Sequence, residues 1–275
     1  MSNIFKTMLA ACAGAMIAGG AMAADVAPAP AAPPTPPWDI AFGMKLANDY
    51  VFRGIDQSNG HFAAQGYVEG RAFDWIYAGV WTSNVSFPQA YGLLDPSAEV
   101  DIYGGIRHTW GNFTADAGVL YYVYPHQVNQ PGLYGMDWAE AYFKPSYVIN
   151  DTFTVGLNGT YGWNYANSGA DSGYVSGTLK AALPPFLPYK DVSTYISGEF
   201  GGQFLGTNRL GVKLPSYATW NVGVGATWSA ITLDLRYSGM SLSHNSCAML
   251  TGVGNWCGQR FIASLAFDTT LFTLK

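Results

Sequence analysis

Residues 38–54 read WDIAFGMKLANDYVFRG, and successive side chains alternate between two kinds. The first row is apolar and aromatic and comprises Trp38, Ile40, Phe42, Met44, Leu46, Tyr50 and Phe52. The second row is small or polar and comprises Asp39, Ala41, Gly43, Lys45, Asp49 and Arg53. A period of two residues predicts a β-strand with one apolar face. At ~3.3 Å per residue this strand would span roughly 50 Å, which is longer than most strands of soluble proteins.

Arg53 raises the question of where its charge goes, because an arginine is costly to bury without a partner. If Tyr50 and Phe52 face lipid, Arg53 faces the inside of a barrel near its extracellular mouth, where water and carboxylates solvate it. Gly54 would then begin the first outer loop. The alternative is a soluble β-sandwich with Arg53 in solvent, which does not account for apolar faces that end in aromatic residues.

The composition also points to a membrane. Charged residues make up only 11% of the chain, against about 25% in an ordinary soluble domain, whereas aromatic residues reach 15% and glycines number 33. Beyond the N-terminus no segment has 18 or more successive apolar residues, which argues against helical spans. A membrane protein without helical spans has to be a closed β-barrel, since only these two structures satisfy every backbone hydrogen bond in lipid.

The alternation recurs along the chain. TWNVGVGATW (219–228) carries a tryptophan at each end of its apolar row, as expected for aromatic girdles at the two membrane interfaces. The predicted strands are 38–54, 61–73, 75–87, 98–111, 113–125, 137–149, 152–165, 172–183, 190–204, 217–229, 231–243 and 259–272. We therefore predict an all-β, transmembrane, antiparallel up-and-down barrel of about 12 strands, an even number, as bacterial barrels have.

The connections support this fold because short and long joins alternate, like periplasmic turns and extracellular loops. Asp74 and the pairs at 111–112, 150–151 and 229–230 are short, and longer segments rich in Gly, Pro and Asn lie between them. The exception is PPFLPYK (184–190), which falls where a short turn is expected.

The N-terminus has the pattern of an export signal. Lys6 precedes an apolar, alanine-rich run that ends in Ala21-Met22-Ala23, so we predict a signal peptide over 1–23, the alternative being an uncleaved anchor. A Pro/Ala-rich linker would follow over 24–37, and the barrel would occupy 38–275 in the outer membrane, in contact with its lipid. Without the signal the chain has 12 basic and 18 acidic residues. This negative charge argues against a nucleic-acid partner.

Cys12 lies in the predicted signal peptide, which leaves Cys247 and Cys257 in HNSCAMLTGVGNWCGQR. An even pair in an exported chain predicts a disulfide across one loop. Free thiols or a metal pair are the alternatives, although no His or further Cys stands at ligand spacing. No cofactor or metal is expected.

The polar row supplies candidate pore residues. We predict that the pore is lined by Lys45, Asp49, Arg53, Glu69, Arg71, Asp101, Arg107, Glu140, Lys144, Asp234 and Arg236. The same row contains Asp39, Asp116, Lys180, Glu199 and Arg260. Acids and bases are about equally numerous, so no preference for cations or anions follows. A barrel of this size should leave a narrow passage for small hydrophilic solutes or ions, unless the charges only pair across strands and close the barrel.

Two other classes of function compete with a pore. One is a closed structural barrel whose outer loops bind a partner. The other is a lipid-acting enzyme with a Ser-His pair, for which SLSHNS around His244 is the candidate; His61 and His126 fall in outer loops, and His108 falls on the lipid-facing row beside Trp110. Assembly into a homo-oligomer stays open, because one sequence does not separate lipid-facing from subunit-facing residues.

Several blocks resemble a known family. NDYVFRGIDQSNGHFAAQGYVEG (48–70), YAGVWTSNVSF (77–87), EVDIYGGIRHTWG (99–111) and GVLYYVYP (118–125) are similar to the TorF porin-like family. This family comprises proteobacterial outer-membrane proteins, originally catalogued as conserved and of unknown function. The resemblance covers about Leu46 to Pro125 and implies a Gram-negative outer-membrane barrel and a channel. One departure is the end DTTLFTLK, where Phe272 stands three residues before the terminus, whereas many such barrels end in an aromatic residue.

Overall fold

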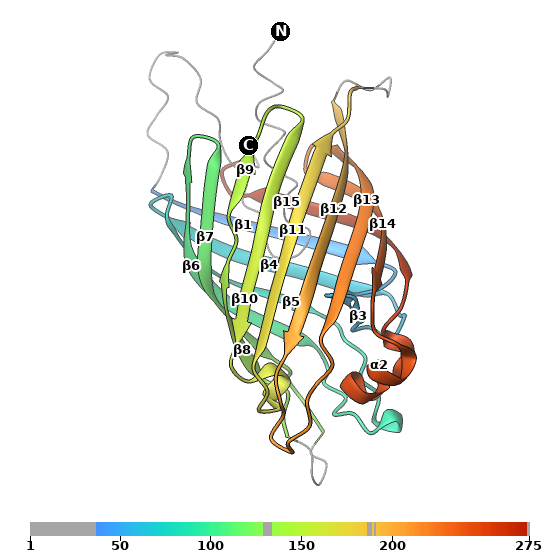
Figure 1. Cartoon of the computed structure of the whole chain (residues 1–275). Helices are drawn as coiled ribbons and strands as arrows, with labels where there is room; N and C mark the ends of the chain where they lie inside the picture. Colours follow the sequence, from blue (N-terminus) through green and yellow to red (C-terminus); the bar gives the residue numbers. More distant parts are fainter. Residues whose placement is uncertain (1–36, 129–133, 186–188, 190, 274–275) are drawn as a thin grey trace, which may run out of the picture.

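The barrel wall begins at Trp38, where the alternating pattern begins (Figure 1). The computed structural model describes residues 37–128, 134–185, 189 and 191–273. The predicted signal peptide and all but the last residue of the predicted linker lie outside these residues. Within them, no helix has the length and apolar character that crossing a membrane requires.

Each predicted strand appears in the wall, and one appears in two pieces. The wall strands are β1 (Trp38–Ala47), β4 (Ala63–Ala72), β5 (Ile76–Ser83), β6 (Glu99–Trp110), β7 (Phe113–Val123), β8 (Trp138–Phe143), β9 (Ser146–Val148), β10 (Phe153–Gly162), β11 (Ser172–Ala182), β12 (Val192–Leu205), β13 (Tyr217–Trp228), β14 (Ile231–Met240) and β15 (Arg260–Thr270). The short elements are β2 (Val51–Phe52), β3 (Ile55–Asp56), η1 (Gln89–Tyr91), η2 (Tyr165–Asn167), α2 (His244–Thr251) and η3 (Gly254–Trp256).

The sheet closes on itself. Every neighbouring pair is antiparallel, β1 pairs with both β4 and β15, and β10 pairs with β11. β8 and β9 together form one position in the ring, because both pair with β7 and with β10. The interruption falls at Pro145, which has no N–H to give to the ladder. In the described part of the chain the prediction of twelve antiparallel strands is thus confirmed, with β8 and β9 counted as one.

The connections alternate in length, as predicted. Between the described strands, four short joins (73–75, 111–112, 149–152 and 229–230) lie at one end, here called the turn end. The fifth join there, 183–191, is as long as the loop 163–171 and is the predicted exception. Long loops (48–62, 84–98, 124–137, 163–171, 206–216 and 241–259) lie at the other end, here called the loop end, where Figure 1 shows α2. The join that contains PPFLPYK connects β11 to β12 at the turn end and is the longest there.

The outside of the barrel is apolar. Exposed side chains in the middle of the wall include Met44, Val68, Val80, Ile102, Val119, Leu157, Val175, Ile196, Val222 and Leu265. Trp38, Trp75, Trp110 and Trp228 are exposed at the turn end, and Tyr121, Tyr161, Phe200 and Phe204 toward the loop end. His108 lies where the sequence placed it and stacks on Trp75 with ring centroids 4.0 Å apart. This surface is that of a membrane-spanning barrel with aromatic girdles.

The inside of the wall explains part of the glycine content. Tyr195 lies directly opposite Gly225 on the neighbouring strand, and a Cβ on that glycine would overlap the tyrosine ring. Gly79 with Tyr103 and Gly118 with Tyr142 repeat the arrangement. A tyrosine ring laid over a cross-strand glycine covers the backbone there and helps to fix the register.

The first predicted strand is corrected at its end, because β1 stops at Ala47 and not at Gly54. The side chain of Asn48 completes the ladder to β15: its Nδ2 donates to the Phe261 carbonyl (3.1 Å), and its Oδ1 accepts from the Ala263 amide (2.7 Å). The main chain is therefore free to leave the wall. Asn and Asp are depleted in strands and favoured in turns, so Asn48-Asp49 was the local signal of this break.

After Asn48 the chain forms a small hairpin, β2–β3, inside the barrel. Arg53 (φ 47°) and Gly54 (φ 84°) both have the left-handed conformation that a tight two-residue hairpin turn requires. The prediction that Tyr50 and Phe52 face lipid was wrong: Tyr50 is buried and its hydroxyl donates to Glu99 (2.9 Å), while the Phe52 ring packs on Tyr122. The period-two pattern continued past Ala47, but the hairpin buries its apolar row within the barrel.

Arg260 on β15 holds the base of the hairpin. Its guanidinium pairs with Asp49 (3.1 Å) and with Asp56 (3.0 Å), and both carboxylates also accept hydrogen bonds from Ser58. The loop 241–259 packs beside it, since the Trp256 indole donates to Asn59 (2.8 Å) and Cys247 is joined to Cys257 in the predicted disulfide.

We expect the disulfide to be detectable in the purified protein. Without the predicted signal peptide the chain has two cysteines, and both are cross-linked, so unfolded but unreduced protein should not react with a maleimide that adds visible mass. After reduction it should gain two adducts on a denaturing gel. Two adducts before reduction would contradict the pairing.

We also expect the hairpin base to respond to pH. Burial, and then the adjacent Asp49 carboxylate, raise the pKa of Asp56 to about 6, whereas an unfolded aspartate titrates near ~3.9. The folded state therefore binds this proton more tightly, and the contribution of Asp56 to stability falls as pH rises from about 4 to 6.

The thermal unfolding midpoint should consequently fall more steeply between pH 4 and 6 in the wild type than in Asp56→Asn. The matched control is Asp95→Asn, an exposed loop position with a left-handed backbone that Asn tolerates. Parallel pH profiles for wild type and Asp56→Asn would contradict the raised pKa of Asp56.

Candidate functional site

The tip of the hairpin carries Arg53, and its charge is fully paired. Arg53 is 9% exposed and Glu140 is 1% exposed. The guanidinium donates two parallel hydrogen bonds to this carboxylate, Nη1 to Oε1 at 2.8 Å and Nη2 to Oε2 at 2.7 Å. Gln203 and Thr160 each accept one more at 3.1 Å. A forked, two-bond contact is the strongest pairing available to a buried arginine.

Aromatic rings complete the surroundings of Arg53. Its guanidinium carbon lies 4.5 Å from the centroid of Phe52 and 4.7 Å from that of Tyr174. Glu140 in turn accepts from the Tyr122 hydroxyl at 3.0 Å. These carboxylate, amide, hydroxyl and ring contacts stabilise the ionised form of Arg53, which answers the question of where its charge goes.

The partners of Arg53 show that the hairpin crosses the barrel. The hairpin leaves the wall after β1, whereas Glu140 is on β8, Thr160 on β10 and Gln203 on β12. In the ring, β10 stands six positions from β1 in either direction. The Arg53 contacts thus tie the tip to the far wall, while the Arg260 contacts tie the base to the near wall.

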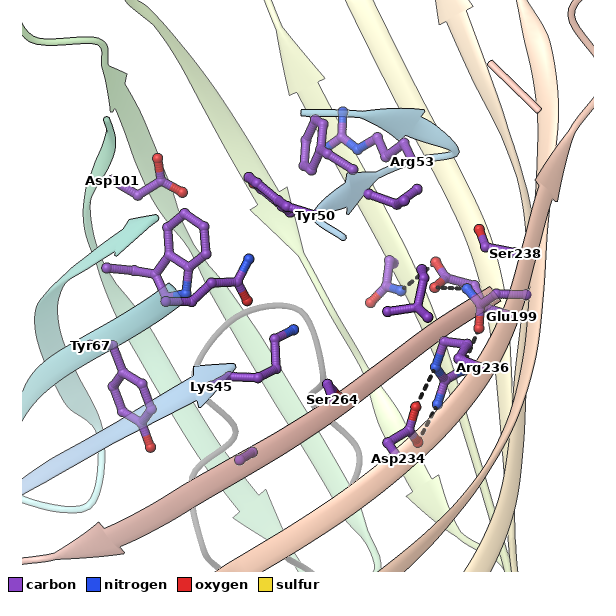
Figure 2. A pocket seen from close by; sticks show the side chains of 18 of the residues that line it. Lys45, Tyr50, Arg53, Tyr67, Asp101, Glu199, Asp234, Arg236, Ser238 and Ser264 are labelled. Carbon is purple, nitrogen blue, oxygen red and sulfur yellow. Dashed lines mark hydrogen bonds and ion pairs between the residues drawn. The ribbon is translucent and has the colours of Figure 1, made fainter. Parts of the chain in front are cut away.

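A cavity of about 260 Å³ lies against this hairpin inside the barrel (Figure 2). Side chains of the hairpin and of the wall strands line it. Its ionisable lining, tyrosines aside, consists of Lys45, Asp49, Arg53, Asp101, Glu140, Lys144, Glu199, Asp234, Arg236 and Asp268. Figure 2 shows Asp101, Tyr67 and Lys45 on one side and Glu199, Arg236 and Asp234 on the other.

The side formed by β10 to β14 is a closed hydrogen-bond network. Arg236 donates to both Asp234 oxygens at 3.0 Å and to Asn221 at 2.5 Å. Glu199 accepts from Ser176 at 2.6 Å and from Tyr174 at 2.9 Å. The groups named here are satisfied by one another, which holds this part of the wall together.

The opposite side, formed by β1, β4, β5 and β6, is different. Asp101 is 8% exposed, and its Oδ1 has no hydrogen-bond partner among the described residues. Lys45 forms no ion pair with any residue that the structure describes. An amine on β1 and a carboxyl group on β6, neither of them in an ion pair, therefore face the same cavity.

Three of the predicted pore residues lie elsewhere. Arg71 pairs with Glu69 (2.7 Å), Glu69 with Arg107 (3.3 Å), and Arg107 with Asp116 (2.9 Å). The Tyr77 hydroxyl joins this chain of charges through Asp116 and Tyr142. These residues face the barrel interior toward the turn end, but they do not line the cavity.

The structure thus gathers eight of the predicted pore residues around one cavity: Lys45, Asp49, Arg53, Asp101, Glu140, Lys144, Asp234 and Arg236. Their role in a pore stays a prediction. Sequence reasoning missed Glu99 and Asp268, although both share the inward parity of their strands. It also left out the neutral lining residues Gln65, Trp81, Asn158, Tyr195 and Asn221, for which alternation was the available signal.

One serine of the Ser-His candidate caps the helix α2. His244 is the first residue of α2, and its ring packs over Gly254. Ser243 caps the helix: its hydroxyl accepts from the Ser246 amide (3.2 Å) and donates to the Ser246 hydroxyl (2.9 Å). The hydroxyls on either side of His244 are therefore bonded to each other.

Comparison with solved structures finds porins and an outer membrane channel. The KdgM porin, in complex with disordered oligogalacturonate, is 8% identical (84% of this chain, 99% of that chain, TM-score 0.49). The NanC porin is 9% identical (84% and 100%, TM-score 0.48). An outer membrane channel from Pseudomonas putida F1 is 14% identical (90% and 100%, TM-score 0.47). No curated protein matches the sequence.

Comparison with family models gives a match over most of the barrel. The matched region, residues 31–253, includes the hairpin, Glu140 and all the cavity-lining strands except β15. The expectation of a bacterial family catalogued as being of unknown function is confirmed. The chain belongs to the family described as bacterial protein of unknown function (Gcw_chp).

Proposed function

We propose that this protein is an outer-membrane channel through which small hydrophilic solutes or ions pass by diffusion. The observation that carries the proposal is the charged cavity inside a closed barrel with an apolar outer surface. In lipid, such a wall separates a polar interior from the hydrocarbon, and charged side chains in a narrow lumen select which solutes enter. The predicted signal peptide and linker fit export to that membrane.

The hairpin would be the constriction of this channel. It reaches across the lumen and is held at both ends by ion pairs, Arg53 with Glu140 at the tip and Arg260 with Asp49 and Asp56 at the base. A solute would have to pass beside it, between the closed network on β10–β14 and the unpaired charges on β1–β6. The passage would therefore admit only small molecules.

A sealed barrel with partner-binding loops is the second candidate, and the packing at the loop end favours it. Phe87 from loop 84–98 contacts Tyr124 and Trp256, with ring centroids 6.1 and 5.5 Å apart, and Ile55 of the hairpin belongs to the same buried cluster. A continuous core of this kind would block the lumen. Lys45 and Asp101 remain unpaired in the cavity, however, and a purely structural ladder would pair them.

We expect single-channel recordings in a planar bilayer to show discrete conductance steps for the detergent-folded protein. Because Lys45 and Asp101 are unpaired in the lumen, Lys45→Ala should shift the ion preference toward cations and Asp101→Ala toward anions. Asp74→Asn in a turn-end connection is the control and should match the wild type. A silent bilayer from protein that shows the heat-modifiable gel mobility of a folded barrel would favour the sealed barrel.

The Arg53–Glu140 pair provides a second test. Arg53→Met strands a buried carboxylate and should cost about 3–5 kcal/mol of stability. It should also free the hairpin tip and increase the conductance. Arg53→Met with Glu140→Gln should recover much of the stability, because no unpaired charge remains and the glutamine oxygen keeps one acceptor for Tyr122 or Thr160. If the double variant loses as much stability as the two single variants together, and the conductance is unchanged, the Arg53–Glu140 pair does not hold the hairpin.

A further inference from the structure

Asp101 stands out among the buried acids of the lumen because the described residues give it neither a counter-charge nor a hydrogen bond. Two residues earlier on the same face of β6, Glu99 accepts hydrogen bonds from Tyr50 (2.9 Å) and Tyr124 (3.2 Å). On β8, Glu140 has Arg53. Among the described residues neither a hydrogen bond nor an ion pair reaches Asp101, and burying such a carboxylate without a partner is costly.

Aromatic side chains surround this carboxylate. Trp81 is its direct cross-strand neighbour on β5, and side chains in that relation lie about 5 Å apart at Cβ. Tyr50 from the hairpin lies 5.6 Å from the Trp81 ring, and Tyr103 and Tyr122 line the same part of the cavity. A carboxylate beside aromatic rings is the arrangement that recognises an ammonium group, through charge and through cation–π attraction.

The charge of the cavity favours the same class of ligand. Its described lining holds six carboxylates (Asp49, Asp101, Glu140, Glu199, Asp234 and Asp268) and four cationic side chains (Lys45, Arg53, Lys144 and Arg236). A metal ion is a poorer fit, because no group of three or more Asp, Glu, His or Cys side chains in the described chain is arranged to hold one. An organic cation needs a single carboxylate and apolar walls.

We propose that Asp101 and Trp81 form a subsite for the ammonium group of a small organic cation or zwitterion inside the barrel. This inference rests on the proposed function in so far as such a solute would pass through the lumen, and it names the class of solute. Asp101 supplies the charge, and Trp81 with Tyr50 supplies the aromatic faces. Binding needs no movement of the paired network on β10–β14.

Isothermal titration calorimetry on the detergent-folded protein tests this directly. The probes are n-butylammonium chloride and tetramethylammonium chloride, with sodium butyrate as the anion of matched size. The variants are Asp101→Asn and Trp81→Leu, and Asp74→Asn is the control for the same chemical change away from the cavity. Heat-modifiable gel mobility confirms folding of each variant.

We expect saturable binding of at least one of the two cations and none of butyrate. Asp101→Asn should weaken binding at least tenfold, Trp81→Leu should weaken tetramethylammonium most, and Asp74→Asn should bind like the wild type. Binding of butylammonium alone supports the subsite with a hydrogen bond to Asp101 as its main contact. Absence of binding by both cations, equal binding of butyrate, or an unchanged affinity in Asp101→Asn would overturn the proposal.

Bilayer recordings on the same samples separate the two proposals. Ammonium binding by a protein that conducts no current would keep the subsite and reject the channel. Conductance steps from a protein that binds neither cation would keep the channel and reject the subsite.

Discussion

The need to pair a buried guanidinium organises the interior of this barrel. Arg53 lies at the tip of a hairpin that leaves the wall beside β1, and its carboxylate partner Glu140 comes from the far side of the ring. An uncompensated charge in this position would cost several kcal/mol, so the hairpin is held across the lumen. Tyr50 and Phe52 also lie inside the barrel: Tyr50 belongs to the buried cluster at the loop end, and Phe52 packs against it.

The wall that receives the hairpin obeys a simpler constraint. Backbone groups that face lipid have no water to bond, so the strands must close on one another. Side chains then divide by parity: apolar residues cover the outside, and polar, small and tyrosine side chains fill the inside. Tyrosines laid over cross-strand glycines, as Tyr195 lies over Gly225, show that interior packing also depends on residues with no side chain.

The polar side chains around the cavity are paired on one side, whereas two of them are unpaired on the other, and the proposed function rests on this difference. On β10–β14 the charges satisfy one another, as Arg236 does with Asp234 and Asn221. On β1–β6 Lys45 and Asp101 are unmatched, and they face the cavity. Matched groups stabilise a wall whatever passes beside it, whereas an unmatched buried carboxylate favours a ligand of the opposite charge.

The sequence by itself determined the barrel, because period-two alternation and alternating loop lengths are local properties that survive in a list of residues. It also determined the disulfide partners and the inward parity of residues such as Asp101 and Glu140. It did not determine that residues 48–60 leave the wall, since Tyr50 to Arg53 keep the alternation of a strand. Which carboxylate pairs with Arg53, and which stays free, was decided only by the closed ring. Closure brings β8, β10 and β12 opposite β1, and such contacts between residues far apart in the chain leave no periodic mark in the sequence.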